Sequence, residues 1–184
     1  MKPGYQNIGI CGLSCRLCPS SYIDGPSRCG GCKSESRMSV GCPFITCAVK
    51  NKGIEFCWEC DENASCERWA GHRKFGQEKD TFVCYASLED NIASIVEDGI
   101  ESFIEKQSAK EELLCEMLDG YNEGRSKTYY CIAATMLDTI DLEIALRNAR
   151  ERTCDMDKRE KSKYLHSLLD SAAIKRSIKL ALRK

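Results

Sequence analysis

Closely spaced cysteines dominate the first third of the chain, where ten of the fourteen cysteines fall between Cys11 and Cys66. Three pairs have C-x2-C spacing and one has C-x4-C spacing. The eight paired residues are Cys15, Cys18, Cys29, Cys32, Cys42, Cys47, Cys57 and Cys60. A tight turn between two such cysteines directs both sulfurs toward one tetrahedral centre, and four thiolates complete that centre. The spacing therefore predicts two metal ions, each bound by four sulfurs.

Two ways of sharing the four pairs between two ions are open. In the sequential arrangement the first and second pairs bind one ion, and the third and fourth bind the other. In a cross-braced arrangement the first pair joins the third. We favour the sequential one because it closes shorter loops. Cys11 and Cys66 are then left over, as extra ligands, substitutes or buried thiols. His72 is an alternative partner for them, although a lone exposed histidine is the simpler interpretation.

The kind of metal follows from compartment and spacing. The chain begins without the apolar run of a secretory signal and has no stretch of eighteen apolar residues, which predicts a cytoplasmic protein with reduced thiols rather than disulfides. Zinc fits the spacing between successive pairs. An iron-sulfur cluster is the alternative, because Cys11, Cys15 and Cys18 match the triplet that holds a four-iron cluster in radical enzymes using S-adenosylmethionine.

Composition explains why the front of the chain would need metal. The first 66 residues contain only eighteen of Ala, Val, Ile, Leu, Met, Phe, Trp and Tyr, beside all four prolines and eight of the thirteen glycines. Such a segment buries too little apolar surface to offset its chain entropy. Structural zinc contributes on the order of 10 kcal/mol or more per site in small domains. We therefore expect metal binding to decide whether this region folds.

The remainder reads as helix, which predicts a mainly α protein with little β. We expect an irregular cysteine-rich metal-binding module over residues 1–70, packed on an α-helical region over 71–184. Helix starts are predicted at Ser87, Ser108 and Ser126 and near Asp157, with a break at Gly99. Less regular features are a polar connector over 71–80, a helix cap at Asp141 and a short alternating strand over 178–182.

Charge separates two parts of the helical half. Residues 86–146 carry fourteen acidic and four basic residues, whereas residues 147–184 carry five acidic and twelve basic residues. A basic segment alone would suggest nucleic acid or an anionic membrane. With an acidic segment before it, we favour mutual neutralisation of the two. No membrane association is predicted, nucleic acid is the less favoured partner, and an unidentified protein partner remains.

The sequence Gly124-Arg125-Ser126-Lys127 is a candidate anion site. Arg125 and Lys127 supply two cations and Ser126 a hydroxyl at the start of a predicted helix, where unpaired N–H groups point outward. The plainer alternative, which we favour, is a loop with Ser126 as the helix N-cap and two solvated cations.

Taken together, the motifs resemble a known family. The runs Cys11-Gly12-Leu13-Ser14-Cys15-Arg16-Leu17-Cys18-Pro19, Cys29-Gly30-Gly31-Cys32, Cys42 through Lys50, and Cys57-Trp58-Glu59-Cys60 to Trp69 occur in this order, and 122–131 follows them. This order is similar to that of the uncharacterised cysteine-rich family catalogued as domain of unknown function 3795. The resemblance implies a zinc-binding protein without an established activity.

Motifs typical of enzymes are absent from the sequence. It contains no Walker loop, no G-x-S-x-G and no H-E-x-x-H, and it has only two histidines. Closed four-sulfur zinc sites also leave no open position for a substrate. The sequence therefore predicts a binding or scaffold protein. The alternative is a redox protein or enzyme that uses a cluster or the thiols of Cys11 and Cys66, with the anion site at Arg125 and Lys127. The four later cysteines are expected to be small core residues, with Cys131 the one to test as a nucleophile.

Overall fold

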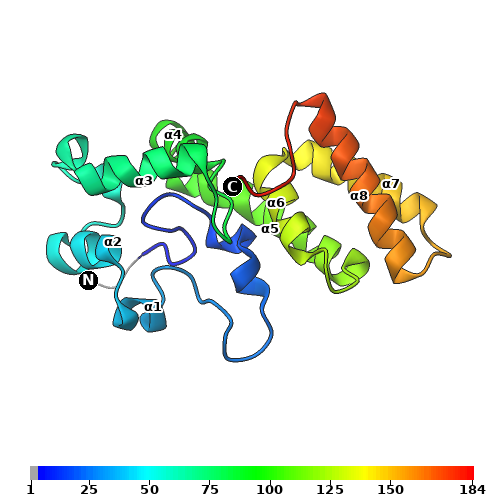
Figure 1. The fold of residues 1–184 in the computed structure, drawn as a ribbon, viewed down its shortest axis with the longest axis horizontal. Coiled ribbons are helices and arrows are strands. Elements are labelled where there is room, and N and C mark those ends of the chain that lie inside the picture. Colours follow the sequence, from blue (N-terminus) through cyan, green and yellow to red (C-terminus); the bar gives the residue numbers. More distant parts are fainter. Residues whose placement is uncertain (1–3) are drawn as a thin grey trace. The chain divides into compact units, whose positions relative to one another are not determined.

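The structure, a computed structural model, describes residues 4–184 and is mainly α-helical, as predicted (Figure 1). Within that range, eight α-helices and several shorter turns bring the helical content to 64%, and the β pairing is limited to an isolated bridge between Ile8 and Ser14. The short strand expected over 178–182 does not form. The described chain divides into two compact units: unit 1 contains residues 4–103 with Arg183 and Lys184, and unit 2 contains residues 104–182.

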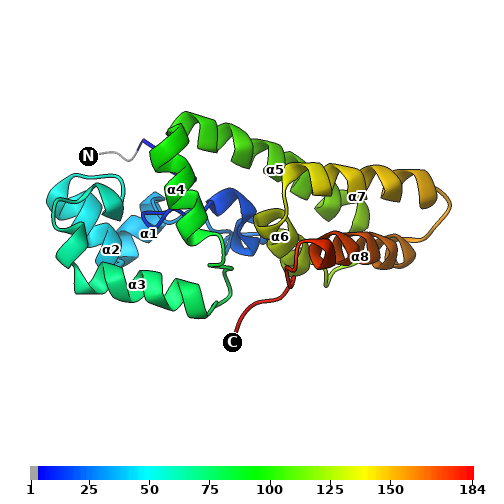
Figure 2. The same cartoon turned by 90° about the horizontal axis from the view of Figure 1, so that it is seen from above.

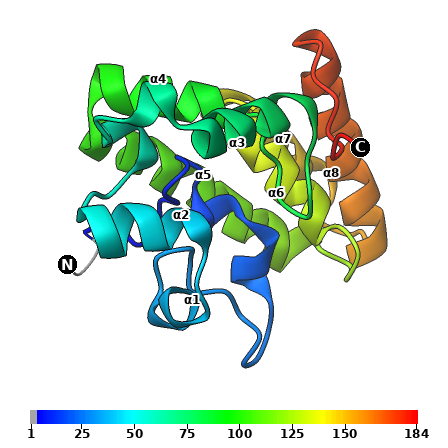
Figure 3. The ribbon, with the colours of Figure 1, turned by 60° about the vertical axis from the view of Figure 1, so that its left-hand side comes forward.

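The cysteine-rich part of unit 1 is a succession of loops and short helical turns (Figure 3). The 3-10 turns span Cys15–Leu17, Pro19–Tyr22, Cys57–Glu59 and Asn63–Ser65. Helix α1 spans Glu35–Val40, and α2 spans Pro43–Ile45 and continues into a π-helical turn over Thr46–Lys52. A small apolar cluster includes residues of α2 and of the π-helical turn. It consists of Ile10, Ile45, Ala48 and Val49.

Helix α3 (Glu67–Glu78) occupies most of the stretch predicted as a polar connector, so that prediction was wrong. Most of the helix surface is polar, and its strongly buried positions are Trp69 and Gly76, too few to produce a clear apolar period. A Cβ on Gly76 would lie 3.4 Å from Leu88 Cδ1, so the small residue permits close approach of the next helix. The helix forms because it packs against α4, not because its own sequence is amphipathic.

Helix α4 (Leu88–Asp98) begins after Ser87 and ends at Gly99, as the sequence predicts, although the Ser87 side chain makes no capping hydrogen bond. Gly99 adopts φ +85°, a conformation that glycine tolerates best. Helix α5 (Ile100–Tyr121) then runs without interruption through Ser108, so the predicted start there was wrong. Gln107 is buried on the same face as Phe103 and Leu114, and this polar residue makes one continuous helix look like two.

Unit 2 combines most of α5 with α6 (Lys127–Met136), α7 (Thr139–Arg152) and α8 (Lys158–Lys175). Helices α7 and α8 lie side by side and antiparallel (Figure 2). Helix α7 has Asp138 at its N-cap position, without a side-chain capping hydrogen bond, instead of the predicted Asp141. Helix α8 has the predicted start, with a capping box between Asp157 and Glu160. The helices enclose fully buried apolar side chains: Leu114, Met117, Leu137, Leu142, Leu146, Leu165 and Leu169.

Ion pairs join the acidic and basic segments within unit 2. Arg150 Nε donates to Glu116 Oε1 over 2.6 Å, and Arg176 pairs with Asp138 and Asp141. These contacts between α5 or α7 and the basic segment accord with the expected neutralisation, so the basic segment does not present all of its charge to solvent.

The chain enters unit 1 again at its last residues. Arg183 binds the nearly buried Asp80 carboxylate through Nε at 3.0 Å and Nη2 at 2.8 Å. Its guanidinium also donates to the carbonyls of Gly76 and Gln77, at the C-terminus of α3. Arg183 therefore satisfies helix-end carbonyls that would otherwise lack partners.

Candidate metal centres

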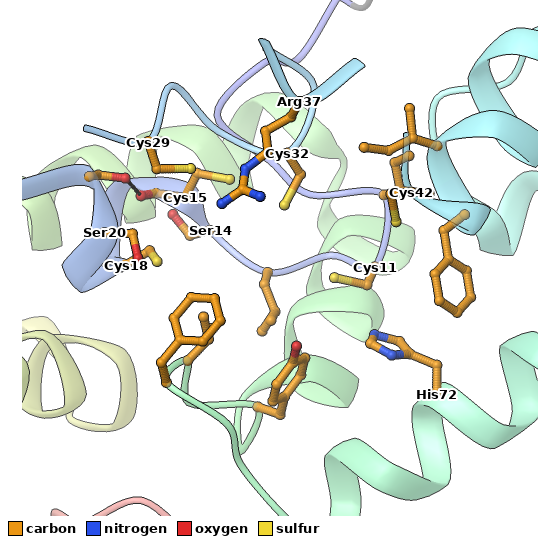
Figure 4. Close-up of a pocket in the computed structure, with 18 of the residues that line it drawn as sticks. Cys11, Ser14, Cys15, Cys18, Ser20, Cys29, Cys32, Arg37, Cys42 and His72 are labelled. Carbon is orange, nitrogen blue, oxygen red and sulfur yellow. Dashed lines mark hydrogen bonds between the residues drawn. The ribbon is translucent and has the colours of Figure 1, made fainter. Parts of the chain in front are cut away.

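Six cysteine thiols line a cavity of unit 1 that measures about 280 Å³ (Figure 4). They are Cys11, Cys15, Cys18, Cys29, Cys32 and Cys42. Arg37 and His72 also line the cavity, and the remaining wall is mostly apolar. No carboxylate lines this cavity. Its donors are therefore mainly sulfur, the ligand set that suits zinc or iron-sulfur centres.

The first two C-x2-C pairs meet at one end of this cavity. The hydrogen bond between the Cys15 and Cys32 thiols lowers the pKa of Cys15 and raises the pKa of Cys32. Burial raises the pKa of Cys18, against hydrogen bonds from Ser20, and the neighbouring Cys29 and Cys32 thiols add to the rise. Cys15 therefore has Cys32 as a neighbour, and Cys18 has Cys29 and Cys32. The sequential arrangement groups these same four cysteines.

Gly31 makes this meeting of pairs sterically feasible. It lies between Cys29 and Cys32 with φ +95°, and an added Cβ would lie 2.8 Å from the carbonyl oxygen of Gln6. The same Cβ would be 3.5 Å from Cys15 Sγ. Any larger residue would push the second pair away from the first.

Cys11, Cys42 and His72 lie together at the other end of the cavity (Figure 4). Burial raises the pKa of the Cys11 thiol to about 12, and the charges of Cys32 and Cys42 contribute to the rise. The Nε2 atom of His72 is buried without a hydrogen-bond partner, and burial lowers the pKa of the ring. His72 is therefore half-buried, between Phe44 and Tyr85, whereas the sequence favoured an exposed histidine.

A second, smaller cavity of unit 1 is lined by the other four thiols of the cysteine-rich stretch. They are Cys47, Cys57, Cys60 and Cys66. Burial raises the pKa of Cys57 to about 12, with contributions from Cys11 and from the other three thiols of this cavity. Lys52 Nζ donates to Cys60 Sγ over 3.2 Å and pairs with Glu62 over 2.9 Å. Lys52 therefore contacts the second group of thiols, which the sequence analysis missed although Lys52 lies between two cysteine pairs.

The predicted C-x4-C pair does not share a cavity. Cys42 lines the first cavity and Cys47 the second, because the helical segment 43–52 begins between them. Cys66, left over in the sequence analysis, lies with the second group. Across residues 4–184, no three His, Cys, Asp or Glu side chains already converge tightly enough to hold an ion. The thiols are thus grouped, and metal binding would require their side chains to close in.

A buried ion pair connects the loops that carry the two groups. Lys33 follows Cys32 and is 2% exposed, and its Nζ lies 2.5 Å from Glu55 Oε2 and 3.9 Å from the centre of the Phe56 ring. Phe56 stacks on Trp58 with ring centres 4.4 Å apart. These residues immediately precede or follow thiols of both groups, so the ion pair fixes the spacing between the loops.

In unit 2, the three predicted anion-site residues have different surroundings. Arg125 and Ser126 line a cleft, whereas Lys127 does not. Ser126 is only 4% exposed, and instead of capping α6 its hydroxyl donates to Glu123 and lies beside Ser162 Oγ and His166 Nε2.

The cysteines outside the cysteine-rich stretch vary in burial. Cys84 and Cys131 are buried, as expected of core residues, and Cys115 is partly buried. Cys154 is exposed, so the prediction of a core position was wrong there; its thiol donates to the carbonyl of Arg150 over 3.2 Å. Cys131 is only 1% exposed, which shields its sulfur from substrates.

Comparison with protein-family models, with curated proteins and with solved structures found no match to this chain. Among the described helices, none is both long enough and apolar enough to cross a membrane.

Proposed function

We propose that unit 1 is a zinc-binding module with two structural sites, each made of four thiolates. The first site uses Cys15, Cys18, Cys29 and Cys32. The second uses Cys47, Cys57, Cys60 and Cys66. The observation that carries the proposal is the division of ten thiols between two separate cavities, each with a complete four-sulfur set. When bound, zinc would supply tetrahedral cross-links between loops that have little apolar core of their own.

The same observation supports a binding or scaffold role over catalysis. A zinc ion with four thiolates has no open coordination position, and the resemblance to the uncharacterised zinc-binding family points the same way. We place the protein in the reducing cytoplasm, where clustered thiols remain available to metal. Its partner, on this proposal, is another protein that recognises the surface shaped by the two ions.

One observation favours a second candidate, an iron-sulfur or thiol-based redox protein. The first cavity offers six thiols where one zinc ion needs four. Cys11 and Cys42 are the surplus, and the unpartnered Nε2 of His72 lies beside them. An all-sulfur donor set with Cys11, Cys15 and Cys18 also suits a four-iron cluster.

A matched pair of single substitutions tests the proposed ligand sets. Protein purified without oxygen is analysed for zinc and iron and for visible absorption, and Cys66→Ser is compared with Cys42→Ser. We expect a colourless protein with two zinc ions, one zinc ion in Cys66→Ser and two in Cys42→Ser. Cys154→Ser, which changes an exposed thiol of unit 2, serves as the control and should retain both ions.

Two results would contradict the proposal. Loss of zinc from Cys42→Ser but not from Cys66→Ser would assign the second site to the four cysteines predicted from spacing alone, which are Cys42, Cys47, Cys57 and Cys60. A brown protein containing iron would favour the redox candidate instead.

A further inference from the structure

A cleft of a different chemical character lies in unit 2. It has a volume of about 950 Å³ and is open to solvent between the loop 122–126 and the first turns of α8. Four exposed cations line it: Arg125, Lys158, Arg159 and Lys163. Arg125 comes from the loop and the other three from α8, so positive charge faces the cleft from both walls.

These four cations lack the ion pairs that other basic residues of the unit form. Arg150 binds Glu116, and Arg176 binds two aspartates. None of the four cleft cations forms an ion pair with any residue between 4 and 184. Their charges are therefore available to a ligand.

The placement of these cations is unfavourable without an anion. Lys158 and Arg159 lie in the first turn of α8, next to the positive end of the helix dipole. Arg159 and Lys163 are four residues apart on one helix and repel each other. The carboxylates of Asp157 and Glu160 in the same turn offset this positive charge only in part; Asp157 accepts the backbone N–H groups of Arg159 and Glu160, each over 2.8 Å. An anion in the cleft would convert both repulsions into attraction.

A buried polar cluster fixes the loop that carries Arg125. The hydroxyls of Ser126 and Ser162 each donate to Glu123 Oε2 over 2.7 Å. Because both hydroxyl protons are used in this way, His166 Nε2, 2.9 Å from Ser126 Oγ, is the donor in that contact. The cluster ties the loop to α8. The cleft lining contains two carboxylates, Glu123 and Asp157, beside the four cations, so positive charge remains in excess.

We propose that this cleft binds the phosphate group of a small phosphorylated molecule. The arginines at 125 and 159 present planar donor groups that match phosphate oxygens, and the lysines at 158 and 163 add charge. The volume falls in the range of small-molecule sites. The proposal concerns unit 2 alone and does not depend on metal in unit 1. It also replaces the sequence triplet, since Lys127 does not line the cleft and the nearly buried Ser126 hydroxyl donates to Glu123.

Calorimetric titration of the full chain tests the proposal. Inorganic phosphate and ribose 5-phosphate are titrated separately, with sodium chloride keeping the ionic strength constant. Arg159→Gln combined with Lys163→Gln removes two cleft cations, and Arg147→Gln combined with Lys179→Gln removes two exposed cations outside it. We expect binding to weaken at least about tenfold in the cleft variant and to change less than about twofold in the control.

The thermal unfolding of the same proteins provides a second measurement. Without phosphate, the cleft variant should melt at or above the temperature of the wild type, because like-charge repulsion has been removed. Tighter binding of ribose 5-phosphate would assign the site to a phosphate ester, and tighter binding of inorganic phosphate to the free ion. Equal responses of both variants, or preferential binding of duplex DNA with a steep salt dependence, would overturn the proposal.

Discussion

Unit 1 and unit 2 differ in what holds their chains in place. In unit 2, the side chains of Leu114, Leu142 and Leu165 have no exposed surface, and four helices close over them. In the cysteine-rich part of unit 1, the cluster around Ile45 is small and the loops carry ten thiols and a buried ion pair. We therefore expect unit 2 to fold on its apolar core and unit 1 to depend on the proposed metal cross-links.

Removal of metal should affect the two units most unequally. A zinc chelator applied to the full chain is expected to unfold residues 4–103, because each site contributes on the order of 10 kcal/mol or more. Residues 104–182 should remain folded. Hydrogen exchange followed by mass spectrometry of peptides checks this. If the amides of unit 1 were equally protected from exchange in metal-free protein, unit 1 would not depend on metal and the proposed difference between the units would be wrong.

A substitution that leaves a cavity in the core of unit 2 should destabilise unit 2 and leave the proposed metal sites of unit 1 unchanged. Leu142→Ala deletes a side chain with 0% exposure and should lower the free energy of unfolding by about 3 to 4 kcal/mol without changing the zinc content. Ile144→Ala, at a position that is 42% exposed, is the control and should cost less than about 1 kcal/mol. Urea unfolding of zinc-loaded protein measures both. If Leu142→Ala released zinc, the two units could not be energetically separate.

Breaking the buried ion pair of unit 1 should lower stability by a slightly smaller amount. Glu55→Gln leaves the Lys33 charge without its partner at a fully buried position, which should destabilise unit 1 by roughly 3 kcal/mol. Adding Lys33→Met to Glu55→Gln removes the uncompensated charge and should recover part of the loss. A double variant no more stable than Glu55→Gln alone would contradict this explanation. Urea unfolding monitored through unit 1 peptides distinguishes the outcomes.

The smallest effect concerns the contact between Asp80 and Arg183. Burial alone would raise the pKa of Asp80, but hydrogen bonds from Arg183 and from the Tyr85 amide outweigh it and lower the pKa. A carboxyl whose folded pKa is lowered stabilises the protein above its unfolded pKa, near 4, and loses that stabilisation as the pH falls through the folded value.

Asp80→Asn should therefore cost roughly 1.5 kcal/mol at pH 7, and the difference from the wild type should vanish in acid. Thermal unfolding of the two proteins across the pH range measures the difference, and any acid release of metal is common to both. A difference that grew on acidification would have the wrong sign for this contact.

Much of the fold could be predicted from local signals. Helices α4, α6 and α8 begin after Ser87, Ser126 and Asp157, as predicted, although only Asp157 caps its helix through its side chain. Gly99 marks the predicted break and has a positive φ, which glycine tolerates best. Helix α3 could not be predicted, because its strongly buried positions are only Trp69 and Gly76, which give no periodic pattern. The buried Gln107 likewise hid the continuity of α5.

The sites were predictable by residue type but not by grouping. Cysteine spacing identifies the thiols, yet Cys42 and Cys47 diverge because a helical segment begins between them. The cleft cations of α8 lie more than thirty residues from Arg125, and only the packing of the loop against α8 brings them together. Long-range contacts of this kind leave no local pattern in the sequence.

X-ray absorption at the zinc edge of protein purified without added metal tests the central claim most directly. We predict two zinc ions per chain, each surrounded by four sulfur atoms at about 2.3 Å. A shell of nitrogen or oxygen near 2.0 to 2.1 Å, or a metal-free protein with a folded unit 1, would contradict it.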